Sequence, residues 1–224
     1  MNAVCARAGT AAQTWLDEAV SRAARGELDA LFAAYTSAPK HTGRDLLQLP
    51  ASERTALAST APGSLFDRWT ADEAGRAVLL LTLAERTGTD QFATAAIECY
   101  ERGDSREQQS WLKALPLLPG PESFLNVAID ACRTNILPQF ECIACENPYP
   151  GRYFPDLNFN QLVLKAMFNG ISLARIVGLN GRLNSELSRM ALDYAAERRA
   201  AGRSVPADLA LALTKDARTE EQFR

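Results

Sequence analysis

Residues 135–182 read NILPQFECIACENPYPGRYFPDLNFNQLVLKAMFNGISLARIVGLNGR, and this stretch differs in character from the rest of the chain. Its middle, residues 146–156, contains Pro148, Pro150 and Pro155. Proline lacks an amide hydrogen and restricts the residue before it, so we expect an ordered loop here rather than regular helix or central strand. A helix with a row of polar side chains is expected to follow this loop.

Outside this stretch, apolar residues recur at helical spacing, and glycine or proline ends most segments. The expected helices cover residues 10–25, 27–38, 51–59, 70–87, 90–102, 105–115, 123–133, 184–201 and 206–213. Thr70 and Glu73 fit a capping box at the start of one of them. No segment alternates as a strand would, so the chain is predicted to be all-α. The short turns favour an antiparallel bundle or a short HEAT-like stack of helix pairs, with one proline-rich loop.

We predict that residues 1–224 form a single helical domain. Within it, residues 1–134 are expected to form helical hairpins, and residues 135–210 carry the unusual stretch. Residues 215–224 are charged and are expected to form a flexible tail.

The composition argues against several classes of partner. The chain has 224 residues and a net charge of −3, without a basic block, so nucleic acid is not an expected partner. The longest apolar run, residues 77–81, is far shorter than the roughly 20 residues that span a bilayer, so no direct membrane insertion is expected. The N-terminus does not read as a secretory signal, and the 5 cysteines are an odd number, so reduced thiols and a cytoplasmic location are expected.

Two interpretations of the proline-rich loop remain open. Prolines fix the backbone, and preorganised side chains such as Tyr149 and Tyr153 lose less freedom on binding a ligand or partner. Alternatively, the loop is a tight connector, and Tyr149, Tyr153 and Phe154 fold back onto the core.

The helix after the loop carries an unusual polar row. Asn158, Gln161, Lys165 and Asn169 share one face, and amides around a single lysine are uncommon on a solvated face. Lys165 would need an anion or a carboxylate if the row is buried, and Glu141 and Glu146 could supply one. The alternative is internal pairing with backbone carbonyls of the proline-rich loop. Arg175 and Arg182 could bind an anion or cap helix ends.

Metal and catalytic motifs are weak in this sequence. Cys142 and Cys145 lie three residues apart on an expected helix, with Cys132 upstream and no second pair, so a core role is favoured over a metal site. The single histidine, His41, has no nucleophile pattern beside it. We therefore expect no metal, no cofactor and no catalytic residue set.

The unusual stretch resembles the signature of the EboA family. The resemblance is carried by ENPYP (146–150), YFP (153–155), FNQLVLKA (159–166) and RIVGL (175–179), and by LDYAAER (192–198) and AGRSVP (201–206). Members of that family are encoded in the ebo gene cluster with a prenyltransferase-like membrane protein and enzyme-like proteins. The cluster is associated with moving secondary-metabolite precursors out of the cytoplasm, so the resemblance implies a role in metabolite traffic.

The main functional hypothesis is a non-catalytic adaptor or small-molecule-binding component of such a system, whose partners are a small metabolite or other ebo-cluster proteins. The residues expected to contact the ligand or partner are Glu146, Asn147, Tyr149, Tyr153, Asn160, Gln161, Lys165 and Arg175. The alternative is an enzyme that uses Glu146 or Lys165 as acid, base or Schiff-base lysine in a pocket walled by the two tyrosines. In a third interpretation the stretch is a structural seam, and function lies on another surface.

Overall fold

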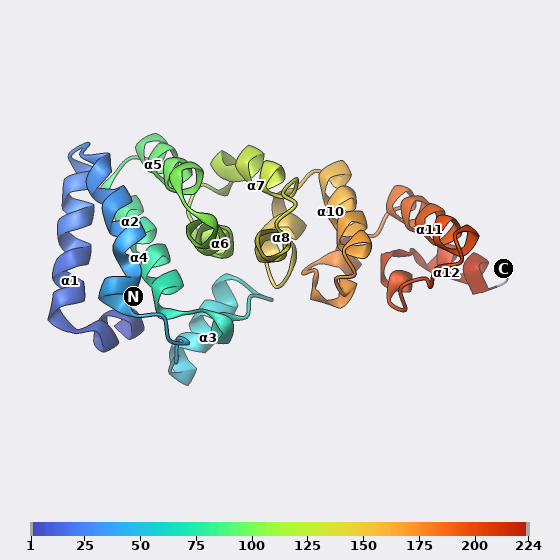
Figure 1. The fold of residues 1–224 in the computed structure, drawn as a ribbon, viewed down its shortest axis with the longest axis horizontal. Coiled ribbons are helices and arrows are strands. Elements are labelled where there is room, and N and C mark those ends of the chain that lie inside the picture. Colours follow the sequence, from blue (N-terminus) through green and yellow to red (C-terminus); the bar gives the residue numbers. More distant parts are fainter. Residues whose placement is uncertain (1, 223–224) are drawn as a thin grey trace. The chain divides into compact units, whose positions relative to one another are not determined.

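The computed structural model describes the backbone of residues 2–222 and the side chains of residues 10–219. The described residues form twelve α-helices and no β-strand, apart from an isolated bridge between Leu46 and Thr70 (Figure 1). The predicted all-α class is therefore confirmed. The chain divides into two compact units, an N-terminal unit (Met1–Asp130) and a C-terminal unit (Ala131–Arg224).

The helices of the N-terminal unit are joined by short turns and three 3-10 segments. They are α1 (Asn2–Ala24), α2 (Leu28–Thr42), α3 (Ala51–Thr60), α4 (Ala71–Arg86), α5 (Thr89–Arg102), α6 (Ser105–Ala114) and α7 (Leu125–Ala131), and the 3-10 segments are Phe66–Arg68, Leu115–Leu117 and Pro121–Phe124. Helix α7 ends at the boundary of the unit.

Helix α4 is the central element of the N-terminal unit. It packs against α1, α2, α5 and α6, and buried residues occur on all of its faces (Figure 1). Its start confirms the predicted capping box, since the Glu73 carboxylate accepts the Thr70 amide at 3.0 Å. The capping box satisfies amides that the first turn of a helix leaves without acceptors.

Helix α2 was predicted to end at Pro39, and that prediction was wrong. The helix continues to Thr42 with Pro39 inside it. Proline removes the hydrogen bond to the carbonyl four residues earlier, which here belongs to Tyr35. The Arg76 Nε donates to that carbonyl at 3.0 Å, so the acceptor that Pro39 leaves open is satisfied from α4.

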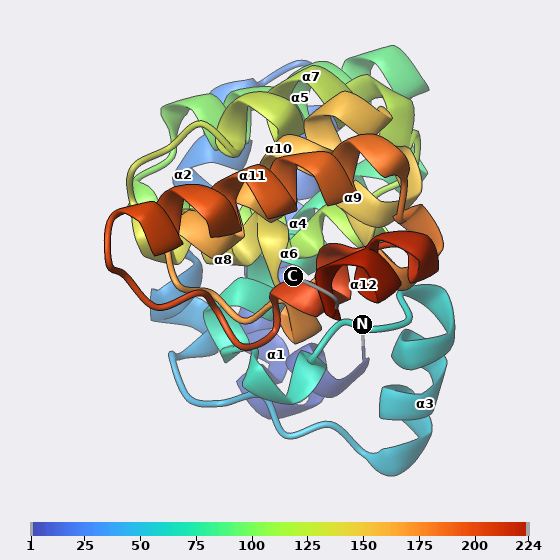
Figure 2. The same ribbon diagram turned by 90° about the vertical axis from the view of Figure 1, so that its right-hand side faces the viewer.

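Helix α3 differs from the other helices of this unit. It lies at the edge of the unit in both views and contributes no buried residue (Figures 1 and 2). The segments on either side of it supply a small apolar core of their own. That core contains Leu47, Leu49, Ala61, Phe66, Trp69, Ala74, Ala77 and Ala114, with Leu57 and Leu117 packed against it.

The C-terminal unit consists of shorter helices and 3-10 segments. The helices are α8 (Leu137–Ala144), α9 (Pro148–Tyr153), α10 (Asp156–Phe168), α11 (Ser185–Ala200) and α12 (Lys215–Gln222), and the 3-10 segments are Leu173–Arg175, Leu179–Arg182 and Leu209–Ala212. Figure 2 shows α11 alongside α10, which it contacts.

Near the C-terminus the structure differs from the sequence expectation. Residues 206–213 were predicted as a short helix, but only the 3-10 segment Leu209–Ala212 forms there. Helix α12 occupies residues for which a charged tail was expected, and residues 223–224 lie outside the described part of the chain.

Candidate functional site

The proline-rich segment is helical where a loop was expected. Helix α9 spans 6 residues and begins with Pro148. The first amides of a helix have no intrahelical acceptor, so prolines in the first turn cost no hydrogen bond, and the prediction of a loop was wrong for this reason. Asn147 caps the helix: its Oδ1 accepts the Tyr149 amide at 3.0 Å, and its Nδ2 donates to the Cys142 carbonyl at 2.9 Å.

The aromatic side chains of this segment pack together. Tyr149 is fully buried, Phe154 is buried and Tyr153 is half-buried. The Tyr149 ring lies 4.9 Å from the Tyr153 ring and 6.2 Å from the Phe154 ring, the latter edge-on. Tyr149 and Phe154 therefore follow the interpretation in which the aromatic residues fold back onto the core.

Glu146 and Arg175 form the best-defined polar contact among the predicted site residues. The Arg175 guanidinium makes a bidentate pair with Glu146 at 2.8 and 2.9 Å and contacts Glu141 at 3.1 Å. The hydrogen bonds that Arg175 donates to Glu146 raise the pKa of Arg175 further above its ordinary value. Glu146 has a φ of 49°, and its amide donates to the Arg175 carbonyl, so backbone and side chain both join the two residues.

Lys165 has different partners from those expected. Its ammonium donates to the backbone carbonyls of Cys132 at 2.7 Å and Thr134 at 2.6 Å and lies 5.0 Å from the Phe140 ring centre. The expected carboxylates are paired with Arg175 instead. Internal pairing with carbonyls is correct in kind, but these carbonyls precede α8 rather than belonging to the proline-rich segment.

The remaining polar residues of α10 and the following segment also have local roles. Asn160 is buried and exchanges side-chain hydrogen bonds with Asn184, each at 3.1 Å, whereas Gln161 is exposed. Arg182 donates to the carbonyls of Gly151 at 2.9 Å and Phe154 at 2.7 Å. It thus holds the C-terminal end of α9, as the capping interpretation expects.

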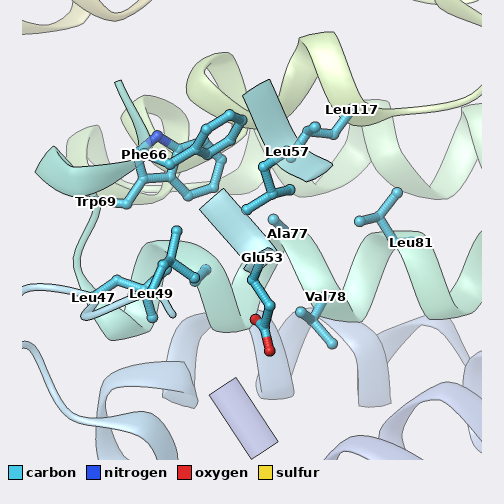
Figure 3. A pocket seen from close by; sticks show the side chains of 11 residues that line it. Leu47, Leu49, Glu53, Leu57, Phe66, Trp69, Ala77, Val78, Leu81 and Leu117 are labelled. Carbon is cyan, nitrogen blue, oxygen red and sulfur yellow. The ribbon is translucent and has the colours of Figure 1, made fainter. Parts of the chain in front are cut away.

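A pocket in the N-terminal unit, which was not predicted from the sequence, has the features of a ligand site. The cavity has a volume of about 80 Å³ (Figure 3). The residues that line it are Leu47, Leu49, Glu53, Leu57, Phe66, Trp69, Ala74, Ala77, Val78, Leu81 and Leu117. Most are buried apolar residues, and those at its rim, including Leu57 and Leu81, are half-buried.

The pocket is built from residues 47–81, which include α3 and the first half of α4, together with Leu117. Figure 3 shows the Phe66 and Trp69 rings next to each other, and their centres lie 5.3 Å apart. Ala77 and Val78 come from α4, and Leu57 from α3. The Trp69 carbonyl accepts the Leu47 amide at 2.7 Å, which fixes the extended segment before α3 against the one after it. Residues 40–50 lie between two expected helices, and the alternation of Leu47 and Leu49 was the signal available to predict this wall.

Glu53 is the single charged residue among the described residues that line the pocket. Figure 3 shows its carboxylate as the one oxygen-bearing group among the side chains drawn. The side chain is half-buried, and within residues 10–219 it has no hydrogen bond or ion pair. An unpaired carboxylate beside apolar walls can accept a hydrogen bond or a positive charge from a ligand.

A second cavity, of about 340 Å³, lies in the C-terminal unit. Its lining includes Ser172, Arg198 and Asp208. These groups are engaged internally: Asp208 accepts from Ser172 Oγ at 2.8 Å, and Arg198 Nε donates to the Ser204 carbonyl at 2.5 Å. Neither cavity is lined by the residues that the sequence predicted as a site.

The cysteines and acidic residues give no metal-binding cluster within the described residues. Cys99, Cys132, Cys142 and Cys145 form no disulfide, and the side chain of Cys5 lies outside the described residues. Burial raises the pKa of Cys132 and of Cys145 to about 12. Both thiols are therefore protonated at neutral pH.

The length and polarity of the helices bear on whether the chain can span a membrane. None of the helices in the described part of the chain is long and apolar enough to cross a membrane.

No curated protein and no solved structure matches the chain significantly. The family model described as metabolite traffic protein EboA matches residues 1–214, which is most of the sequence. The chain therefore belongs to the EboA family of metabolite traffic proteins.

Proposed function

We propose that this protein is a non-catalytic helical component of a secondary-metabolite trafficking system that binds a small molecule in the pocket of the N-terminal unit. The observation that carries the proposal is a cavity with apolar walls and one unpaired carboxylate. Small-molecule sites are typically concave and apolar, with a few polar groups that orient the ligand. A cytoplasmic location is part of the proposal.

The size of the pocket limits what it holds in this conformation. A dry apolar cavity of about 150 Å³ binds benzene, so a volume of about 80 Å³ accommodates only part of a ring-sized group. A larger metabolite would enter by displacing α3. No residue of this helix is fully buried, and Leu57 packs against the small core from its edge, so displacement of α3 disturbs little of the core.

The residues of the enzyme alternative support a structural role better than a catalytic one. Tyr149 is fully buried, Glu146 is paired with Arg175, and Lys165 is held by two carbonyls. A lysine bonded in this way lacks the approach to a substrate carbonyl that a Schiff base requires. We therefore interpret the family-like stretch as a scaffold, while other ebo-cluster proteins remain candidate partners on the exposed surface.

Native mass spectrometry of the protein purified from cells that carry the ebo cluster tests the proposal. The wild type is expected to retain a small molecule, and Ala77→Leu is expected to lose it because the added carbons fill the cavity. Leu57→Gln, which makes the rim polar, should weaken retention, whereas the control Leu137→Gln changes an exposed leucine of the C-terminal unit and should not.

Fluorescence provides a second measurement. Trp69 lines the pocket, so bound molecules should change its emission, and Trp69→Phe should remove that response while the signals of Trp15 and Trp111 remain. Absence of a bound molecule, together with no Trp69 response to the metabolite extract of the same cells, would rule the proposal out. Thermal unfolding of each variant establishes that it is folded.

A further inference from the structure

We infer that the pocket selects ligands in which an apolar part is followed by an ammonium or other N–H-bearing group, and that Glu53 binds that group. The inference rests on the proposed function, because it concerns the ligand of the same pocket. It adds the chemical class of the ligand and the residue that recognises it.

The selectivity follows from the contrast between Glu53 and its surroundings. The other described lining residues present hydrocarbon or aromatic surface, and Glu53 presents two carboxylate oxygens without a partner. Apolar walls lower the local dielectric, so a positive group beside this carboxylate is attracted more strongly than in bulk water. A ligand carboxylate in the same position would be repelled.

The position of Glu53 in the first turn of α3 offers another reason for an acidic residue there. A negative charge near a helix N-terminus interacts favourably with the helix dipole. That effect requires no ligand and does not require the side chain to line a cavity. Asp90 lies in the first turn of α5, is exposed and does not line the pocket, so it serves as the matched control.

Helix α3 can bring Glu53 to ligands of different length. The segment is tied down by an exposed ion pair between Arg54 and Asp67 at 3.2 Å and by Arg54 Nη2 donating to the Leu49 carbonyl at 3.3 Å. Exposed pairs of this kind contribute little to stability, so the main cost of displacing α3 is the packing of Leu57 against the small core. When it settles over a ligand, Glu53 moves with it onto the polar end.

The test uses three probes that share a phenylbutyl tail and differ at its end, namely phenylbutylamine, phenylbutanol and phenylpentanoate. Their affinities are measured by Trp69 fluorescence for the wild type, Glu53→Gln and Asp90→Asn. The wild type should bind the amine about five- to tenfold more tightly than the alcohol, and the carboxylate most weakly. Glu53→Gln should bring the amine and the alcohol within about twofold, while Asp90→Asn keeps the wild-type order.

Hydrogen exchange adds a measurement that would not respond to the amine if Glu53 had only a structural role. Phenylbutylamine should slow amide exchange in α3 of the wild type, and less so in Glu53→Gln. Equal affinity for all three probes, or an amine preference that survives Glu53→Gln, would overturn the inference and leave the pocket intact. If none of the probes binds and Ala77→Leu retains the same molecules as the wild type, the proposed function fails as well.

Discussion

Arg76 donates hydrogen bonds to three groups inside the N-terminal unit, one of which is Ser110 Oγ at 3.3 Å. Its Nε donates to the Tyr35 carbonyl that Pro39 leaves open, and its Nη1 donates to Asp72 at 2.9 Å. Asp72 is 1% exposed and Arg76 is 3% exposed. Desolvation acts to raise the pKa of Asp72, but the Thr70 hydrogen bond and the Arg76 pair outweigh it and lower that pKa below 3.8.

Asp72→Asn is expected to destabilise the N-terminal unit by about 3 kcal/mol at pH 7, because it leaves the Arg76 charge buried without its counter-ion. Since the folded-state pKa of Asp72 is depressed, its contribution is present above pH 3.8 and is lost as the pH falls through the lower folded value. The difference between variant and wild type should therefore shrink in acid. Urea unfolding across pH measures it, and Asp17→Asn, from an exposed pair with Arg86, should cost less than about 1 kcal/mol.

Gly151 marks a close backbone approach in the C-terminal unit. A Cβ at this position would lie 2.6 Å from the Val177 carbonyl oxygen, too close for any real contact. Gly151→Ala is therefore expected to separate α9 from the segment that contains Val177. It should lower the free energy of unfolding by about 2 kcal/mol, which thermal unfolding measures. Gly181→Ala has open space around the added methyl and should be nearly neutral. Equal effects of the two changes would contradict this account.

At the scale of elements, Lys165 joins α10 to the segment before α8. Lys165→Met would keep the apolar stem but leave the carbonyls of Cys132 and Thr134 without this donor, at an expected cost of about 1–3 kcal/mol. Gln161→Ala changes an exposed residue of the same helix and should alter stability by less than about 0.5 kcal/mol. Probe binding in the N-terminal pocket should be unchanged in both. Loss of binding without loss of stability in Lys165→Met would return this lysine to the ligand site.

The helices also show which sequence signals were sufficient to predict where a helix begins and ends. Helical periodicity and the Thr70–Glu73 capping box predicted α4 to within one residue at each end, because both signals are local. The predictions based on Pro39 and Pro148 were wrong for different reasons. The carbonyl that Pro39 leaves open is satisfied by Arg76, a tertiary contact that sequence spacing does not reveal. Pro148 stands at a helix position where no bond is lost, which local rules could have recognised.

At the scale of the whole molecule, the two units each contain buried thiols. Cys99 and Cys145 are 2% and 5% exposed. Burial raises the pKa of both, to about 12 for Cys145, so they stay protonated at pH 8. Iodoacetamide at that pH is expected to leave both unmodified in the native protein and to modify them in urea, as mass spectrometry would show. Rapid native labelling of either would mean that its unit opens locally.

The same burial sets an alkaline limit. A thiol with a raised folded-state pKa contributes stability that is fully present below its ordinary pKa of 9.0 and is lost as the pH rises toward the folded value. For Cys145 that window runs from 9.0 to about 12.

The candidate site was less accessible from sequence than the fold. The site was predicted in residues 135–182 because their composition is unusual, yet Glu146, Asn147 and Lys165 have structural partners. The pocket is built from common residues, such as Leu57 and Ala77, whose proximity is a tertiary property. A lone Glu53 in a polar-looking helix carries no local signal that it faces a cavity.

Helix α3 covers the pocket but contributes little to the hydrophobic core, which is formed by other elements. None of its 10 residues is fully buried and Leu57 packs against the small core from its edge, whereas changes in α4 disturb packing on every face. Substitutions at the exposed positions of α3 are therefore expected to leave the fold intact. Under the proposed function, changes confined to α3 would alter which ligand is bound while the fold is retained, and exchange of this one helix is the corresponding route to redesign.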